Sequence, residues 1–195
     1  MNKTLYLIRH GTSLHNLYYN KIGEMAYRKF MDSPLMNEGV EEARKLKKEW
    51  TELNDIELVL TSPLSRSLST TDIIFRNTST PIIALDELLE YPQSYHRCNM
   101  RCAVGDLIKI YPKINFDNID NNIDFEFMDD KRGNNEEIKY LEKRIQKLKG
   151  WIKNRKERKI AIVGHSSYMN YMINSLVDNE TTELKHCVPY KYVIN

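Results

Sequence analysis

The sequence predicts an α/β fold in three layers, with helices on both faces of a mainly parallel β-sheet. Short apolar runs recur along the chain without polar residues at alternate positions, which is typical of strands buried on both faces. Segments with apolar residues at helical spacing separate these runs. No internal repeat and no clear second domain interrupts the alternation, so we expect a single domain over residues 1–195.

The N-terminal part of the chain follows this pattern from its start. Residues 3–8 are nearly all apolar and predict the first strand, whereas residues 12–31 are polar and aromatic and are expected to be helical or irregular. A helix is then expected from Asn37 to about residue 53. Its inward-facing side would be formed by Val40, Ala43, Leu46 and Trp50.

A second strand is predicted over residues 56–60 and a third over residues 81–85. Between them, Ser62 and Pro63 indicate a helix start, because serine caps helices well and proline fits the first helical position. The inward-facing side of this helix would be formed by Leu64, Leu68, Thr71 and Phe75.

Residues 91–133 interrupt the alternation of strand and helix patterns. They contain Pro92, Pro112 and an Asn/Asp-rich run, so we expect an insertion over one end of the sheet, helical only around residues 104–110. The alternation then resumes with a helix over residues 135–154, a strand over 159–163, a helix over 166–176 and an edge strand over 191–194. The inward-facing side of the long helix would be formed by Ile138, Leu141, Ile145, Leu148 and Ile152.

Composition and charge narrow the class of protein. The 29 basic and 27 acidic residues give a formal net charge of +2, which indicates neither a nucleic-acid nor a membrane partner. Three cysteines are too few for a disulfide framework, and no apolar run reaches transmembrane length. The first strand begins too early for a signal peptide. We therefore expect a cytoplasmic protein, with a viral or organellar setting and the oligomeric state left open.

Arginine and histidine follow three of the expected strands. Arg9 and His10 end the first strand. Arg66 lies in the first helical turn after the second strand, and His165 follows the fourth. The carboxyl ends of parallel strands meet at one edge of a sheet, so these side chains should converge there. Arginine and a helix N-terminus both favour phosphate, whereas no carboxylate cluster accompanies the histidines. The pattern predicts a phosphate site without a metal or another cofactor.

A serine hydrolase is a competing interpretation. Ser166 lies in a segment that partly matches a nucleophile elbow, and Asp178 and His186 follow in the order of a catalytic triad. Tyr168, however, stands where that motif has its second glycine, and fewer than thirty residues follow Ser166. This interpretation also leaves the arginines unexplained, so we favour the phosphate site.

Metal and nucleic-acid sites have less support in the residues. His96, Cys98 and Cys102 match no common zinc spacing, and the two cysteines are more typical of packing residues one helical turn apart. The basic run over residues 153–159 is typical of a solvated helix end, where lysines suit the negative end of the helix dipole.

Segments along most of the chain match known motifs in order. They are LIRHGTSLHN at residues 7–16, SPLMNEG at 33–39, TSPLSRSLSTT at 61–71, LE at 89–90 and VGHS at 163–166. Together they resemble the histidine phosphatase superfamily, in its phosphoglycerate mutase-like branch, and imply the α/β/α fold of that family. More weakly, HRCNMR at residues 96–101 is similar to plant and fungal phosphoglycerate mutase-like proteins.

The resemblance implies roles for the matched residues. His10 would be the nucleophile that takes the phosphoryl group, and Glu90 would protonate the leaving oxygen and then activate water. The phosphate would be bound by Arg9, Asn16, Arg66, His165 and Ser166. The guanidinium groups should lower the pKa of His10, which must be neutral to attack, and should also depress the pKa of Glu90 in the empty pocket.

The sequence departs from the family pattern around the acid. Thr12 stands where mutases often have glutamate, and Glu90 lacks the usual following glycine. Glu87 and Asp86 therefore stay open as alternative proton donors. Asn99 stands where the plant and fungal relatives have aspartate.

The insertion at residues 91–133 would form a lid over the pocket. A second anionic group on the substrate would be met by Arg97, Arg101, Lys131 and Arg132. We therefore expect metal-independent hydrolysis of phosphomonoesters of small metabolites through a phosphohistidine on His10. A phosphoglycerate mutase-type phosphotransferase and a catalytically impaired phosphate-binding protein stay open as alternatives.

Overall fold

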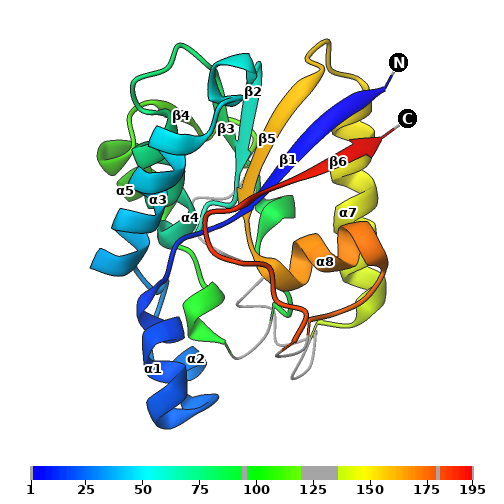
Figure 1. Ribbon diagram of the computed structural model, residues 1–195. Coiled ribbons are helices and arrows are strands. Elements are labelled where there is room, and N and C mark those ends of the chain that lie inside the picture. The colour runs from blue at the N-terminus through cyan, green and yellow to red at the C-terminus, as the bar shows by residue number, and fades with distance from the viewer. Residues whose placement is uncertain (1, 94–95, 120–135, 179–180, 195) are drawn as a thin grey trace.

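A computed structural model describes residues 2–93, 96–119, 136–178 and 181–194. The strands in this part of the chain form one six-stranded sheet in the order β4-β3-β2-β5-β1-β6, which confirms the predicted fold class (Figure 1). Every neighbouring pair is parallel except β1 with β6. The strands are β1 (Lys3–Arg9), β2 (Leu58–Thr61), β3 (Ile82–Ala84), β4 (Ile114–Asn115), β5 (Lys159–Gly164) and β6 (Pro189–Ile194).

Helices cover both faces of the sheet. They are α1 (Leu14–Ile22), α2 (Met25–Lys29), α3 (Asn37–Glu49), α4 (Ser65–Phe75), α5 (Val104–Ile110), α7 (Ile138–Lys153) and α8 (Ser166–Asn174), with single 3₁₀ turns η1 (Leu53–Asp55), η2 (Asp86–Leu88) and η3 (Arg97–Asn99). Figure 1 shows α3, α4 and α5 on one face and α7 and α8 on the other. α1 and α2 lie beyond the carboxyl-terminal end of β1, where they border the expected site.

The sheet is buried on both faces, as the continuous apolar runs predict. Tyr6 and Ile8 of β1 belong to the core that includes residues of α3 and α4. Leu5 and Leu7 belong to the core that includes residues of α7 and α8. Each of these four side chains is at most 2% exposed. Because burying one such side chain stabilises the fold by about 1.5–3 kcal/mol, the two cores fix the strand ends that carry the site.

The inward-facing positions predicted for α3, α4 and α7 are buried, with two exceptions. Val40 is half-buried, and Ile138, the first residue of α7, is 44% exposed. α3 also ends at Glu49, earlier than predicted, because Trp50 leaves the helix with an extended backbone.

The predicted helix start at Ser62 and Pro63 is wrong, because α4 begins at Ser65. A residue distant in sequence supports this start: Asp32 accepts hydrogen bonds from the Ser65 N–H at 2.8 Å and from its hydroxyl at 2.7 Å. The Ser62 hydroxyl instead lies 2.8 Å from Nε2 of His165. A buried ring nitrogen needs a hydrogen-bond partner, so the serine that resembled a helix cap serves the candidate site.

The segment 91–133 is only partly an insertion over the end of the sheet. α5 confirms the helix predicted within it, whereas β4 extends the sheet beside β3 and was not predicted. Residues 120–133 lie outside the described part of the chain. Cys98 and Cys102 do not share a helical turn, because η3 ends at Asn99.

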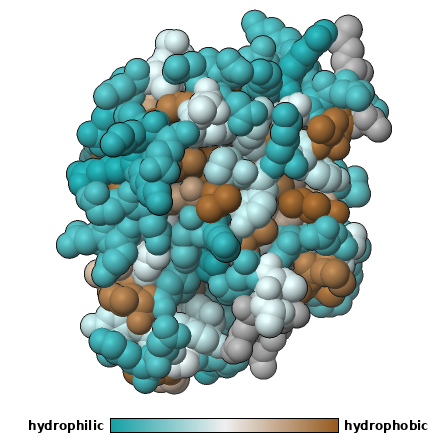
Figure 2. Space-filling model, viewed as in Figure 1, coloured by the Kyte–Doolittle hydropathy of each residue, from teal (hydrophilic) through white to brown (hydrophobic). Residues whose placement is uncertain are grey.

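The face of the molecule that Figure 2 draws is mainly polar. Figure 2 shows one face on which hydrophilic residues predominate and hydrophobic residues form separate patches. None of the helices in the described ranges combines the length and the hydrophobicity needed to span a membrane.

Gly11 and Gly39 bring the turn after β1 against the first turn of α3. A Cβ atom on Gly11 would lie 2.5 Å from the backbone oxygen of Gly39. A side chain there would push apart two backbone segments that cannot yield by a rotamer change. The pair therefore fixes the position of the neighbouring His10.

We expect Gly11→Ala to lower the free energy of unfolding by about 1–3 kcal/mol, because the backbone must shift to admit the methyl group. The control is Gly150→Ala in α7, where the added Cβ would meet no atom within 4 Å. That variant should raise the free energy of unfolding by about 0.5–1 kcal/mol, since alanine is the better helix former. Urea unfolding measures both values, and a Gly11→Ala protein as stable as the wild type would contradict the close approach.

Candidate active site

The ends of β1 and β5 and the start of α4 come together at one edge of the sheet, as the sequence predicts. His10 follows β1, and His165 follows β5, which pairs with β1 so that Arg9 lies opposite Gly164. Arg66 lies in the first turn of α4, after β2 on the other side of β5. The two histidine rings have their centroids 5.1 Å apart. Parallel pairing therefore brings residues from three distant parts of the sequence to one edge of the sheet.

Hydrogen bonds fix the tautomer of His10. Its Nδ1 lies 2.7 Å from the carbonyl oxygen of Gly11, which can only accept, so Nδ1 carries the proton. Nε2 then holds a free lone pair and accepts a hydrogen bond from Nε of Arg66 at 3.1 Å. Burial, and next the positive charge of Arg66, lower the pKa of His10 well below its ordinary value. The ring is therefore neutral at pH 7, with Nε2 as its nucleophilic atom.

Arg66 is held rigidly, with 1% of its surface exposed. Its Nη1 donates to the carbonyl of Cys98 at 2.6 Å, and its Nη2 donates to Oδ1 of Asn99 at 2.9 Å. Asn99 is a neutral amide at the position where the sequence resembles relatives with aspartate. The buried charge of Arg66 is therefore not cancelled by this neighbour, and it stays available to an anion.

His165 is the second buried imidazole of the site. Nη2 of Arg66 lies 3.3 Å from Nδ1 of His165, and because a guanidinium only donates, Nδ1 accepts. Nε2 of His165 therefore carries the proton and donates to Ser62 at 2.8 Å. Burial and the charge of Arg66 lower the pKa of His165 well below its ordinary value, so this ring is also neutral at pH 7.

Arg9 supplies a second guanidinium and has an unused donor. Its Nη1 donates to the carboxylate of Glu183 at 2.8 Å and to the carbonyl of Leu184 at 2.7 Å. Its Nε is buried and has no hydrogen-bond partner among the described residues. An unpartnered buried N–H is costly, so this group is suited to bind an oxygen of a ligand.

Glu90 is the carboxyl group that lies beside the histidines. Its Oε2 is 4.0 Å from Nδ1 of His165, and its Oε1 accepts the backbone N–H groups of Tyr91 at 2.8 Å and Tyr168 at 3.3 Å. Burial raises the pKa of Glu90 to about 7, outweighing the Tyr91 N–H and the arginines, which lower it. The arginines thus lower this pKa as expected, but desolvation is the larger effect, and the pKa of Glu90 lies above its ordinary value.

A model of the histidine phosphatase superfamily (branch 1) matches residues 5–190, almost the whole chain. This chain is a member of the histidine phosphatase superfamily. Phosphoglycerate mutase-like protein 1 of Arabidopsis thaliana is 27% identical over an alignment of 209 positions, which covers 89% of this chain and 72% of the relative. Because this relative is a plant protein, it agrees with the similarity of residues 96–101 to plant and fungal phosphoglycerate mutase-like proteins.

Solved structures of phosphatases and mutases share the fold. The α-ribazole phosphatase of Shigella flexneri aligns with a TM-score of 0.60 at 20% identity, over 98% of this chain and 90% of that one. A phosphoglycerate mutase of Thermus thermophilus aligns with a TM-score of 0.55 at 16% identity, over 96% of this chain and 91% of that one. The family match and the fold shared with solved phosphatases and mutases together support the interpretation of this chain as an enzyme.

A small cavity lies at the candidate active site of this member of the histidine phosphatase superfamily. Its volume is about 140 Å³, and it opens onto a wider hollow of about 550 Å³ that shares several lining residues. The cavity is lined by five of the residues predicted from the sequence: Arg9, His10, Asn16, Glu90 and Ser166. Arg66 and His165 do not line it themselves, but both contact the lining residues, Arg66 through His10 and His165 near Glu90.

A larger cavity of about 670 Å³ lies at the other end of the sheet, near the start of β1. Lysine and arginine side chains contribute most of its lining, and its described lining residues include no histidine, cysteine or carboxylate. It therefore offers neither a nucleophile nor an acid of the kind that the smaller cavity holds.

Two of the predicted substrate-binding residues are not brought into the cavity. Arg101 is buried, and its Nε pairs with Asp86 at 2.9 Å. Arg97 is exposed and is not among the lining residues. Lys131 and Arg132 lie outside the described residues. The described part of the structure thus gives no support to a second anion-binding group from this segment.

The alternative acids are also placed elsewhere. Asp86 faces Arg101, and Glu87 pairs with Lys147 of α7. Neither Asp86 nor Glu87 lines the cavity, whereas Glu90 does. Among these three carboxyl groups, Glu90 is therefore the candidate proton donor.

The serine-hydrolase interpretation fails on geometry. The Ser166 hydroxyl accepts the backbone N–H of Leu184 at 2.7 Å. His186 instead directs Nδ1 to the backbone carbonyl of His10 at 2.5 Å, and Asp178 accepts hydrogen bonds from Asn170 and Ser167. The three residues of the supposed triad are therefore not linked to one another among the described residues.

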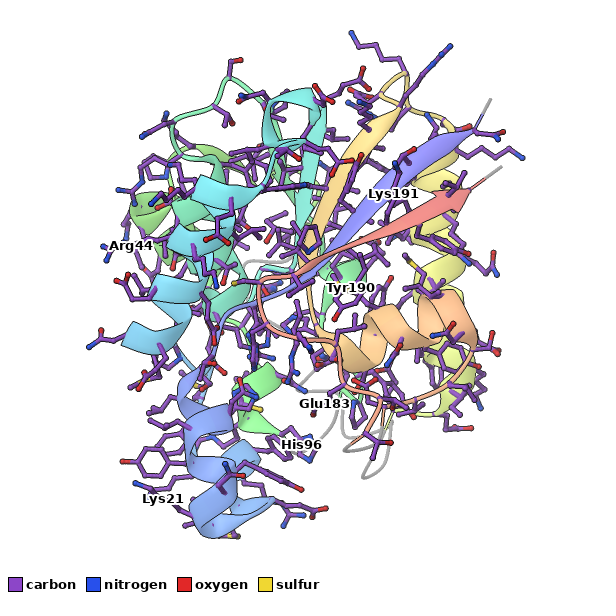
Figure 3. The ribbon with its side chains drawn as sticks, viewed as in Figure 1. Lys21, Arg44, His96, Glu183, Tyr190 and Lys191 are labelled. Carbon is purple, nitrogen blue, oxygen red and sulfur yellow. The ribbon has the colours of Figure 1, made fainter. Side chains whose placement is uncertain are left out.

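Sequence reasoning did not assign most of the cavity wall to the site. The lining residues that it missed include His15, Tyr27, His96, Asp178 and Glu183. Figure 3 shows His96 and Glu183, which come from distant parts of the chain, at the same end of the molecule. Two of these residues lie in segments that match known motifs, His15 in residues 7–16 and His96 in residues 96–101. Tyr27, Asp178 and Glu183 come from segments without a recognisable motif, and only the tertiary structure brings them to the site.

Proposed function

We propose that this chain is a phosphomonoesterase that acts on small metabolites through a phosphohistidine on His10, without a metal ion. The observation that carries the proposal is the state of His10. Its neutral ring holds an unprotonated Nε2 at the cavity, with Nδ1 anchored to Gly11 and the Arg66 guanidinium at 3.1 Å. A nucleophile and a fixed positive charge at the same point suit attack on a phosphoryl group.

In the first step, Nε2 of His10 attacks the phosphorus atom. A P–N bond forms and the P–O bond to the alcohol breaks, with its electron pair passing to the leaving oxygen. Protonated Glu90 gives that oxygen its proton, which is possible because its pKa is raised to about 7. As Nε2 becomes phosphorylated, Nε of Arg66 exchanges its hydrogen bond to the ring for one to a phosphoryl oxygen. The free Nε of Arg9 binds another oxygen.

In the second step, water attacks the phosphorus atom and the P–N bond breaks. The carboxylate of Glu90 now accepts a proton from the attacking water, and the electron pair of the P–N bond returns to Nε2. Inorganic phosphate leaves, and the neutral His10 is restored. The two arginines supply the positive charge that stabilises both steps, so the scheme needs no metal ion.

Trapping of the phosphoenzyme tests this proposal. The wild-type protein, in the presence of a chelator, is mixed with 4-nitrophenyl phosphate, quenched with alkali and examined by intact mass and peptide mapping. We expect one phosphoryl group on His10, stable in alkali and labile in acid. Activity that depends on metal would sink the metal-free mechanism. Phosphate binding without phosphoenzyme or turnover would indicate the impaired binding protein, and isomerisation of phosphoglycerate would indicate the mutase.

Glu90→Gln should lower kcat/KM for alkyl phosphates by about 10²–10³-fold, because the alkoxide would leave without a proton. For 4-nitrophenyl phosphate, whose leaving group needs no proton, the loss should be much smaller. In the wild type, kcat/KM for an alkyl ester should fall as pH rises through about 7, because the acid is then ionised. That alkaline limb should disappear in Glu90→Gln.

The matched control is Glu87→Gln, which removes a nearby carboxylate that does not line the cavity. It should keep both the rate and the pH profile. Glu90 would not be the acid if Glu87→Gln lost as much activity as Glu90→Gln, with both losses equal on alkyl and aryl esters.

A further inference from the structure

The outer part of the active-site cavity has a charge opposite to that of its inner part. Arg9 and Arg66 supply the positive charge next to His10. The carboxylates of Asp178 and Glu183 line the outer part, where both the small cavity and the wider hollow open. Glu183 is 49% exposed at its side chain although one oxygen binds Arg9, so it presents negative charge to anything that enters.

No other basic side chain offsets these carboxylates within the described lining. Among the described residues that line the cavity and the hollow, Arg9 is the only arginine or lysine. The remaining basic candidates are four histidines, and burial is the largest cause that lowers the pKa of each, so they are neutral at pH 7: His10, His15, His96 and His186. Arg97 and Arg101 lie elsewhere, as described above.

Aromatic rings form the wall next to these carboxylates. Tyr27 and His96 have ring centroids 4.8 Å apart at an interplanar angle of 38°. The ring of Tyr19 also contacts that of Tyr27, with centroids 5.3 Å apart at an interplanar angle of 32°. Such rings offer flat apolar surface to the carbon skeleton of a substrate, and their faces attract cations.

We propose that this site selects phosphomonoesters whose alcohol part is neutral or cationic, and that it discriminates against esters that carry a carboxylate near the phosphate. This inference rests on the proposed function and concerns its substrate class. The phosphate is held by Arg9 and Arg66, and the alcohol lies between Tyr27 and the carboxylates of Asp178 and Glu183. A second anion on the alcohol would meet these carboxylates with no counter-charge among the described lining residues other than Arg9, which holds the phosphate. The site would thus discriminate by electrostatic repulsion.

Two nearly isosteric esters test the charge preference. Glycerol 2-phosphate and 2-phosphoglycerate differ by one hydroxymethyl group in place of one carboxylate. We expect the neutral ester to have a kcat/KM at least about tenfold higher, because a unit charge about 6 Å away still acts strongly at a partly buried site. O-Phosphoethanolamine should be used at least as well as the neutral ester. For any ester turned over slowly, its inhibition constant against 4-nitrophenyl phosphate gives the same comparison.

Variants identify the source of the preference. Glu183→Gln and Asp178→Asn should each reduce the neutral-to-anionic ratio by about threefold or more, and raising the salt concentration should reduce the wild-type ratio in the same direction. Glu142→Gln removes an exposed carboxylate of α7 that binds Tyr171 outside the cavity, so it should leave the ratio unchanged. A ratio is internal to each variant and is insensitive to a general loss of activity.

The outcomes separate this inference from the proposed function. Hydrolysis of 4-nitrophenyl phosphate with equal or better use of 2-phosphoglycerate would overturn the charge preference and leave the phosphohistidine mechanism intact. A preference that survives both carboxylate substitutions unchanged would also overturn it. Absence of turnover and of phosphoenzyme with every ester would overturn the proposed function itself.

Discussion

His10→Ala is expected to lower kcat/KM by about 10⁴-fold or more, because it removes the only atom that forms the covalent intermediate. No phosphoenzyme should be trapped from this variant. Binding of inorganic phosphate, measured by calorimetry, should persist, since Arg9 and Arg66 remain. Retained turnover would sink the proposed mechanism, because water would then attack the ester directly.

His15→Gln provides the most informative comparison for His10→Ala. The centroid of the His15 ring lies 6.2 Å from that of His10, and its Nδ1 lies 3.0 Å from the hydroxyl of Ser13. We expect this variant to form the phosphoenzyme on His10 and to change kcat/KM by less than about tenfold. A phosphoryl group found on His15 in the wild type would assign the nucleophile to the wrong histidine.

Arg66→Met is expected to lower kcat/KM by about 10³-fold, because it removes the buried guanidinium that stabilises the phosphoryl oxygens. The same variant should raise the pKa of His10. The sign follows from electrostatics: the charge of Arg66 opposes protonation of the ring, so its removal favours the imidazolium. The pKa should remain below its ordinary value, because burial is the larger cause and persists. Histidine NMR titration measures this shift.

Arg44→Met is the matched control, because Arg44 lies on the surface of α3 with 64% of its side chain exposed (Figure 3). It should change neither kcat/KM nor the pKa of His10. Arg66→Met also removes the Arg66 donor from the carbonyl of Cys98, at a cost of about 1–3 kcal/mol, and leaves Oδ1 of Asn99 with only the weak thiol donor of Cys98. If folding fails for this reason, Arg66→Lys keeps the charge, and it should retain the lowered pKa of His10 while losing most of the activity.

The sheet could be predicted because its strands differ strongly from their surroundings. The runs that became β1 and β5 are continuous and apolar, and burial on both faces requires such a composition. Elements that depend on distant partners were less accessible. β4 has two residues and forms only because it pairs with β3, and the start of α4 depends on Asp32, more than thirty positions away. A local pattern carries no information about either contact.

The meeting of arginine and histidine side chains at the candidate site could also be predicted. Arg9, His10 and His165 lie directly at strand ends, so the order of strands alone brings them together. The proton donor was less certain in the sequence because three carboxylates, Asp86, Glu87 and Glu90, lie within five positions. The structure separates them, since the backbone after η2 turns only Glu90 into the cavity.

The sequence by itself determined the fold class and the family and indicated His10 as the candidate nucleophile, because each depends on residues close together in the chain or on the order of strands. Only the tertiary structure decided the raised pKa of Glu90 and the acidic, aromatic outer wall with Tyr27 and Glu183. A pKa depends on how much water burial removes, and a cavity wall depends on which distant segments meet. Both are properties of three-dimensional packing, and no stretch of sequence specifies them alone.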